Sequence, residues 1–109
     1  MAYNLELADR IQLIIAQFAA LDPRRMFGGI GFMINGNMAC GVIDNYLIVR
    51  VGPDLYEQML KMPNTRGFDF TGRPMTGWIT VSAEGIETDE ALITWVHRGL
   101  EFAQSLPPK

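Results

Sequence analysis

The sequence predicts an α+β domain in which an antiparallel sheet carries its helices mainly on one face. Two observations predict this class: helical periodicity at both ends of the chain, and apolar runs between them that are separated by short turn signals. The expected order is α-β-β-β-α-β-β-α, which keeps the helices apart from an antiparallel meander. The 109 residues contain no linker, repeat or low-complexity tract, so residues 1–109 are expected to form a single two-layer domain.

The first helix is expected over residues 5–21. Apolar residues recur there at helical spacing, and the polar residues between them form a wet side. Asp22-Pro23 ends this helix, because proline disfavours a helical residue before it and cannot extend the hydrogen-bond ladder.

A three-stranded meander is expected over residues 30–51. The Asn35-Gly36 pair lies between two apolar runs and predicts a type I′ hairpin, in which both central residues have positive φ. Asp44-Asn45 marks a second turn, and residues 46–51 read as the third strand.

The second half contains a short helix, two strands and a long final helix. Pro53 starts the short helix, which ends near Met62. Phe68 and Phe70 predict a short edge strand, and residues 78–82 alternate as a further strand. Thr88 is the expected N-cap of the last helix, which runs to about residue 104.

Composition excludes several classes of function. The chain has 9 Lys+Arg against 12 Asp+Glu, a net charge of −3 and a pI of about 5.0, and its basic residues are scattered, which argues against direct nucleic-acid binding. No apolar run reaches the roughly 20 residues of a membrane span, and no secretory signal is visible. One Cys and one His cannot build a zinc site. We expect a cytoplasmic protein with a reduced thiol and no cofactor or metal.

Two motifs invite a catalytic or nucleotide-binding interpretation. The run Gly28-Gly29-Ile30-Gly31 leads into a strand, whereas a phosphate loop leads into a helix, so a tight bend or bulge is favoured. Cys40 and His97 could form a thiol enzyme, but a buried apolar role for Cys40 is favoured. No catalytic residue is therefore assigned.

Two binding hypotheses remain open beside each other. Arg24, Arg25 and Arg73 could contact an anion or a partner, and a small-molecule or anion site would use Arg25, Arg73 and the Gly28-Gly29 bend beside Tyr46. Solvated arginines paired with carboxylates are the alternative. The last helix carries more apolar residues than one face can hold, which predicts an interface with a protein partner or a second copy through Ile93, Val96 and Leu100.

The residues 25–32 (RMFGGIGF), followed by Asn35-Gly36 and later by Gly72-Arg73-Pro74-Met75 and Gly77-Trp78, resemble the N-terminal domain of the TfoX/Sxy family of competence regulators. The resemblance covers nearly the whole chain from Arg24 onward. Its signature positions, expected to be architectural, are Met26, Phe27, Gly28, Gly29, Gly31, Gly36, Gly72, Arg73, Pro74 and Trp78.

The resemblance implies a two-layer α+β domain that regulates DNA uptake and competence genes in bacteria. Members of this family are regarded as non-enzymatic and as acting with the transcription machinery, and the family supplies no catalytic residue to carry over. Longer members have a second, C-terminal domain, so this chain is expected to be a stand-alone copy of the first.

Overall fold

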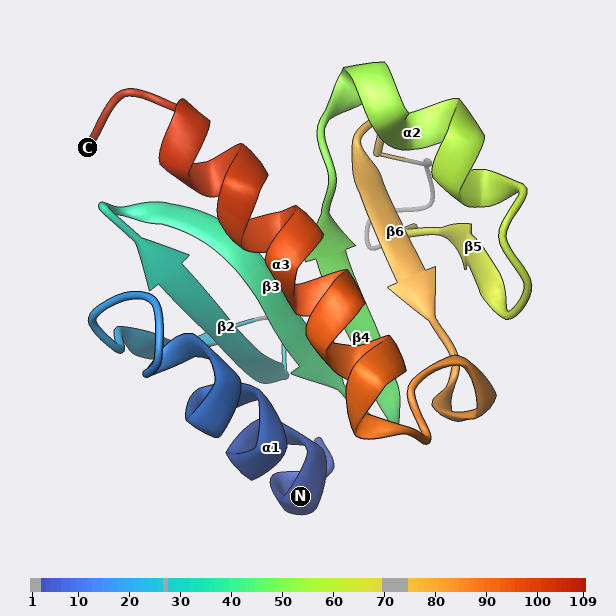
Figure 1. Ribbon diagram of the computed structural model, residues 1–109, viewed down its shortest axis with the longest axis horizontal. Helices are drawn as coiled ribbons and strands as arrows, with labels where there is room; N and C mark the ends of the chain where they lie inside the picture. The colour runs from blue at the N-terminus through green and yellow to red at the C-terminus, as the bar shows by residue number, and fades with distance from the viewer. Residues whose placement is uncertain (1–2, 27, 70–74) are drawn as a thin grey trace.

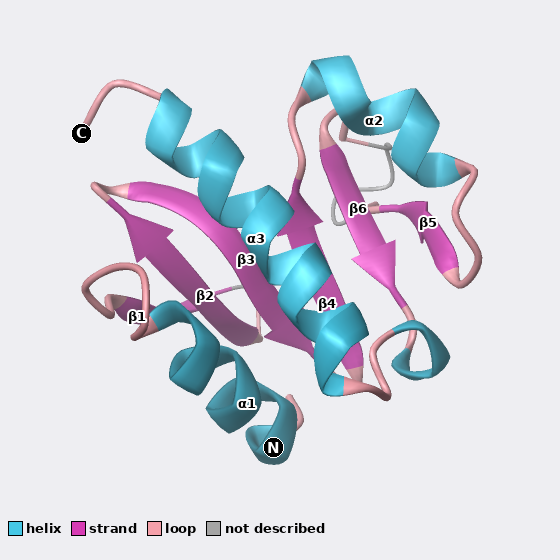
Figure 2. Ribbon diagram, in the orientation of Figure 1, coloured by secondary structure: helices cyan, strands magenta, loops and turns pink. Residues whose placement is uncertain are grey.

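The computed structural model describes residues 3–26, 28–69 and 75–109, and these residues form one antiparallel sheet with helices over it (Figures 1 and 2). The helices are α1 (Leu5–Ile15), α2 (Pro53–Leu60) and α3 (Asp89–Ser105), with a 3₁₀ turn at Ala83–Gly85. The strands are β1 (Pro23–Met26), β2 (Gly29–Ile34), β3 (Asn37–Ile43), β4 (Tyr46–Arg50), β5 (Thr65–Gly67) and β6 (Trp78–Val81). They lie in the order β1-β2-β3-β4-β6-β5. The predicted class and order of elements are confirmed, with β1 as an additional edge strand.

The β2–β3 hairpin turns as predicted at Asn35 and Gly36. Their φ angles are 52° and 84°, which is the left-handed region that a type I′ turn requires at both central positions. The C-terminal tail closes over this turn, where the Lys109 backbone amide donates to the Asn35 carbonyl at 2.8 Å and the Asn37 side-chain amide donates to the Pro107 carbonyl at 3.0 Å. Two hydrogen bonds therefore hold the hairpin turn against the C-terminal tail.

Helix α1 ends at Ile15, six residues before the predicted end. The residues after it form tight turns, in which the Phe18 and Ala19 amides both donate to the Ile15 carbonyl at 2.9 Å. The apolar spacing continued to Leu21, but Phe18 instead packs edge-on against the His97 ring of α3, with 4.5 Å between ring centroids. The contact between Phe18 and His97 therefore forms in place of the last helical turns that the apolar spacing predicted.

The predicted edge strand lies a few residues earlier than expected, at β5. Thr65 fixes this position, because its hydroxyl donates to the carbonyls of Met59 at 3.0 Å and Met62 at 2.7 Å at the end of α2. Phe68 follows the strand and is buried, while Phe70 falls outside the described residues.

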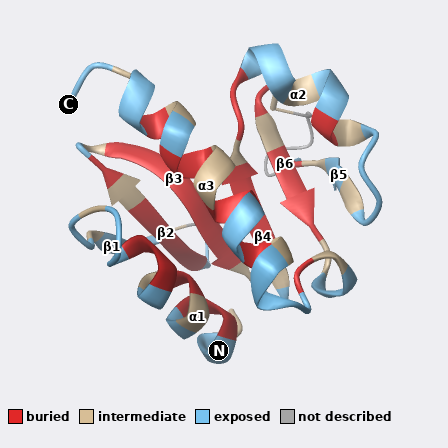
Figure 3. Cartoon of the chain, in the orientation of Figure 1, coloured by how far each residue is buried: buried red, intermediate tan, exposed pale blue. Residues whose placement is uncertain are grey.

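The sheet's two faces follow from its register. Phe32, Cys40, Val49 and Ile79 pair across β2, β3, β4 and β6, and all are buried under the helices. Helices α1 and α3 run across this face, and α3 lies over β3 and β4 (Figures 1 and 3). The neighbouring row alternates to the opposite face and consists of Gly31, Gly41, Ile48, Thr80 and Arg66.

Helix α3 begins as predicted, with Thr88 as its N-cap. The Thr88 hydroxyl accepts a hydrogen bond from the Ala91 amide at 3.1 Å, and Asp89 and Glu90 lie in the first turn, near the positive end of the helix dipole. Gly99, in the middle of the helix, lies against the Ala39 carbonyl of β3, which explains a glycine where alanine is the better helix former.

Candidate functional site

The glycine run enters the sheet through a tight turn rather than a helix. Gly28 has a φ of 76°, which favours glycine, and a Cβ at Gly29 would lie 2.1 Å from the Val42 carbonyl oxygen of β3. Phe27 lies outside the described residues. This arrangement brings two strands close together and presents no helix N-terminus to a phosphate.

Two further glycines make room for methionines on the sheet face opposite the helices. A Cβ at Gly31 would lie 3.2 Å from the Met26 sulfur, and a Cβ at Gly41 would lie 2.7 Å from the terminal methyl of Met38. Met38 is buried and Met26 half-buried, so these glycines allow side chains from β1 and β3 to pack over the sheet.

The arginines that could form an anion site do not converge within the described residues. Arg24 pairs with Asp22 at 3.2 Å, and the adjacent Arg25 alternates to the other side of β1; both are exposed. Gly72, Arg73 and Pro74 lie outside the described residues, so the structure gives no position for that part of the predicted site.

Tyr46 does line a cavity, as the anion hypothesis required, but with different partners. The cavity measures about 270 Å³, and Asn64, Thr65, Arg66, Thr80 and Ser82 complete its described wall. Neither Arg25 nor the Gly28-Gly29 bend is part of that wall. Arg66 is among the basic residues that, from the sequence, could converge on an anion, with Arg24, Arg25, Arg50 and Arg73, and it is the one of them in the described wall.

Trp78 links the sheet to the end of α3. The Arg50 guanidinium lies 5.2 Å from the centroid of the Trp78 ring and 5.3 Å from that of Phe102 on α3. Because the cation is stacked between two aromatic rings, this signature tryptophan contacts other parts of the fold rather than a solvent-filled site.

Cys40 and His97 do not form a catalytic pair. The Cys40 thiol is fully buried in β3, and burial raises its pKa to about 12. The buried Nε2 of His97 has no hydrogen-bond partner among the described residues, and no hydrogen bond joins it to the thiol. A protonated, inaccessible thiol lacks the nucleophilicity that a thiol enzyme needs.

Within 3–26, 28–69 and 75–109 there is no group of three His, Cys, Asp or Glu side chains placed to hold a metal ion. In the same residues, no helix has the length and apolar character needed to cross a bilayer.

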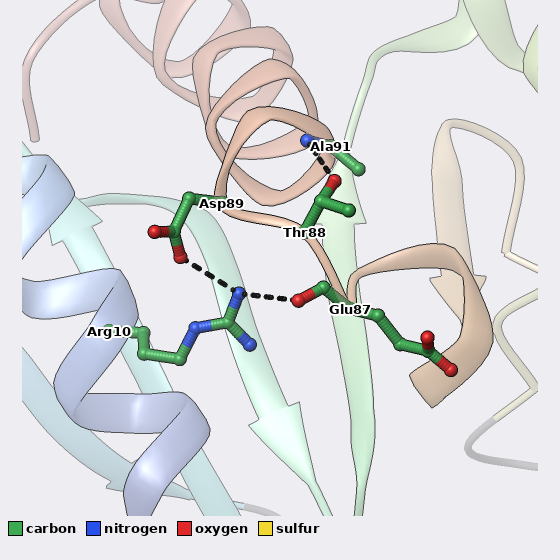
Figure 4. Close-up of polar contacts among 5 residues, drawn as sticks. All are labelled: Arg10, Glu87, Thr88, Asp89 and Ala91. Carbon is green, nitrogen blue, oxygen red and sulfur yellow. Dashed lines mark hydrogen bonds and ion pairs between the residues drawn. The ribbon is translucent and has the colours of Figure 1, made fainter.

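Helices α1 and α3 run side by side, and polar contacts of Arg10 join them at one end (Figure 4). The Arg10 guanidinium donates to the Asp89 carboxylate at 3.3 Å and to the Glu87 carbonyl at 3.5 Å. At the other end, Phe18 packs edge-on against His97. These two contacts fix the lateral position of α1 against α3.

Three large apolar side chains on these two helices and on the turn after α1 are exposed. Ile93 is four residues from both Asp89 and His97, so it lies on the same stripe of α3, and Leu13 lies one turn beyond Arg10 on α1. The exposed fractions are 71% for Leu13, 51% for Phe18 and 38% for Ile93. We call these three residues the α1–α3 surface.

This surface corrects the predicted interface on the last helix. Val96 is 0% exposed and Leu100 is 3% exposed, because both side chains point into the core between α3 and the sheet. Neither can contact a partner without unfolding. Of the three predicted residues, Ile93 alone stays accessible, and the other two residues of the α1–α3 surface come from α1 and the turn after it.

Comparison with known proteins identifies the family to which the chain is similar. The family model described as the TfoX N-terminal domain matches residues 14–103. A search of curated proteins returned no significant match. The matched range contains the glycine run, the β2–β3 hairpin, Trp78 and most of α3.

Proposed function

The chain belongs to the TfoX N-terminal domain family, and from this premise we propose that it is a non-enzymatic regulatory module that acts by contacting a protein partner. The regulated process would be competence or transcription in the bacterial cytoplasm. The single observation that carries the proposal is the α1–α3 surface, because large exposed apolar side chains on two adjacent helices are typical of protein interfaces.

The state of Cys40 supports a role without chemistry. The alternative function of a thiol enzyme requires an accessible thiolate beside a base. The Cys40 thiol is instead buried, and burial raises its pKa so that it is protonated at neutral pH. No residue in the α1–α3 surface carries a nucleophile, so contact is the function that this surface supports.

The charges around the α1–α3 surface indicate what kind of partner it suits. Glu6 and Asp9 on α1 and Glu90 on α3 are exposed carboxylates close to it in sequence, whereas Arg10 is already paired with Asp89. A partner that presents apolar side chains flanked by Lys or Arg would complement this pattern. A second copy would place carboxylates near carboxylates, so a different protein, such as a component of the transcription machinery, is the favoured partner.

Affinity capture with matched variants tests the proposal. Leu13→Glu introduces a charge into the α1–α3 surface at a highly exposed position, and Leu55→Glu makes the same change on α2, where the leucine is also exposed. We expect wild type and Leu55→Glu to retain transcription components from the native host and Leu13→Glu to lose them. Both variants should keep the wild-type unfolding midpoint, because exposed substitutions change stability by less than about 0.5 kcal/mol.

Sedimentation of the purified protein separates the two kinds of partner. A monomer that captures transcription components supports a contact with another protein. A dimer that Leu13→Glu dissociates would assign the surface to self-association. Equal capture by wild type and Leu13→Glu, with no dimer, would contradict the proposal.

A further inference from the structure

The cavity beside Tyr46 lies on the face of the sheet opposite the helices. Thr80 alternates with Ile79 and Val81, whose side chains are in the core under the helices, so the Thr80 side chain lies on the other face. The cavity of about 270 Å³ opens at the end of the sheet formed by β4, β6 and β5. It is therefore separated from the α1–α3 surface by the thickness of the sheet.

Arg66 reaches across this end of the sheet. Arg66 lies on β5 and is paired with Thr80 on the neighbouring strand β6. Its guanidinium carbon nevertheless lies 5.0 Å from the centroid of the Tyr46 ring on β4, which is on the far side of β6 in the sheet. The side chain therefore crosses β6 on a diagonal, because Ile48 and not Tyr46 lies in the same row as Arg66 and Thr80. Stacking on the ring restricts the guanidinium, so less conformational entropy is lost when a ligand binds to it.

Thr80 supplies a second, independent sign of a ligand. The residue as a whole is only 6% exposed, but its hydroxyl oxygen is accessible and makes no side-chain hydrogen bond to any described residue. An accessible hydroxyl of this kind can both donate and accept a hydrogen bond. A hydroxyl of this kind on a cavity wall is available to something that enters the cavity.

The charge and chemistry of the wall specify what could enter. Arg66 is the one charged residue among the six described lining residues, and it forms no ion pair with a described carboxylate. The hydroxyls of Tyr46 and Thr80 and the side-chain amide of Asn64 add neutral donors, whereas the Ser82 hydroxyl already donates to the Asn64 carbonyl at 3.4 Å. The wall thus offers a guanidinium fork and several donors without a carboxylate, which suits a group with several anionic oxygens.

We propose that this cavity binds a phosphate group, either inorganic phosphate or the phosphate of a small monoester, with Arg66 and Thr80 as its principal donors. A volume of about 270 Å³ lies just below the range of about 300–1,000 Å³ that is usual for drug-sized ligands, so a nucleotide is larger than the site. The proposal does not depend on the α1–α3 surface or on the partner proposed above.

Titration of the isotopically labelled protein with phosphate tests the site, with backbone amide chemical shifts followed by NMR. The probes are inorganic phosphate and glycerol phosphate, each added at constant pH and ionic strength with chloride as the reference anion. Saturable shifts are expected for the amides of residues 46, 64–66 and 80–82. Whichever probe binds more tightly identifies free phosphate or a phosphate monoester as the source of the ligand.

Three variants separate the site from general charge effects. Arg66→Gln should weaken phosphate binding about tenfold or more, because a charge-assisted hydrogen bond is lost. Arg24→Gln removes the same charge from β1, where Arg24 already pairs with Asp22, and should leave the affinity unchanged. Thr80→Val should weaken binding about threefold to tenfold.

The Thr80→Val variant also guards against a purely structural explanation. Its unfolding midpoint should equal or exceed that of the wild type, because the hydroxyl that it removes has no partner in the fold. Reduced affinity in a variant of undiminished stability supports the site. Equal phosphate affinity in wild type and Arg66→Gln, or shifts that do not saturate with either probe, would overturn the proposal.

Discussion

Replacing Gly99 by Ala reverses the usual effect of this substitution in a helix. Alanine is favoured over glycine in a helix interior by about 1 kcal/mol, so helix propensity alone predicts a more stable protein. In this fold an added Cβ would lie 2.4 Å from the Ala39 carbonyl oxygen and 3.1 Å from its carbon, both of them backbone atoms of β3. We therefore expect Gly99→Ala to destabilise the protein.

The magnitude follows from how far α3 would have to move. A carbon and a carbonyl oxygen in contact lie about 3.3 Å apart at the closest, so the helix must retreat from β3 by roughly 1 Å. Overpacking of this kind costs about 1–3 kcal/mol, and the 17-residue helix is held by buried side chains on both sides of Gly99. After the gain of about 1 kcal/mol in helix propensity, a net loss of up to about 2 kcal/mol remains.

Urea unfolding measures this loss. Gly99→Ala should lower the midpoint without changing the slope, and the melting temperature should fall by about 4–8 °C for each kcal/mol. Gln104→Ala, an exposed position in the same helix, is the control and should stay within about 0.5 kcal/mol of wild type. A Gly99→Ala variant that is more stable than wild type by the roughly 1 kcal/mol of helix propensity would refute the close approach of α3 to β3.

Three other perturbations test separate parts of the fold. Gly36→Val should cost more than about 1 kcal/mol in urea unfolding, because φ is 84° there and a Cβ would lie 2.8 Å from the Lys109 Cβ; an unchanged midpoint would contradict the hairpin. Burial raises the pKa of the Cys40 thiol from about 9 to about 12, so the unfolded chain loses the proton first and the thiol's contribution to stability, complete below about pH 9, declines as the pH rises toward 12. The fall in unfolding midpoint between about pH 8 and pH 11 should be smaller in Cys40→Ala, and an equal fall would show that the thiol is not buried as described. Thr88→Ala should cost about 1 kcal/mol through the lost N-cap, measured by thermal unfolding, whereas a cost near zero would mean that the cap does not form.

Much of the fold could be predicted because local chemistry and tertiary structure agree. Asn35-Gly36 has the conformational freedom that a type I′ turn needs, and Thr88 has a hydroxyl at the position where the last helix lacks partners for its first amides. Gly99 indicated close packing because a glycine in the middle of a helix is unfavourable without it.

The differences arise where tertiary contacts decide. Strand β1 has exposed arginines and no alternating apolar pattern, so only its pairing with β2 defines it as a strand. The end of α1 depends on Phe18 finding the His97 ring, which lies 79 residues away in sequence. Neither contact leaves a periodic signal in the sequence.

The candidate sites were harder to predict than the fold, for the same reason. An excess of apolar residues on α3 indicated an interface, but periodicity alone could not show that Val96 and Leu100 face the sheet while Ile93 stays exposed. Tyr46 was expected beside a cavity, yet Arg66 reaches it from a strand two positions away in the sheet. Both sites join residues distant in sequence.

The most direct test of the central claim compares contact with chemistry in the native host. The chromosomal copy is replaced by Leu13→Glu or by Cys40→Ala, with the level of folded protein checked in each strain, and competence-gene transcripts are measured against wild type and a deletion. If the protein acts by contact through the α1–α3 surface, Leu13→Glu should match the deletion and Cys40→Ala should match wild type. Normal transcripts with Leu13→Glu and deletion-like transcripts with folded Cys40→Ala would contradict the account.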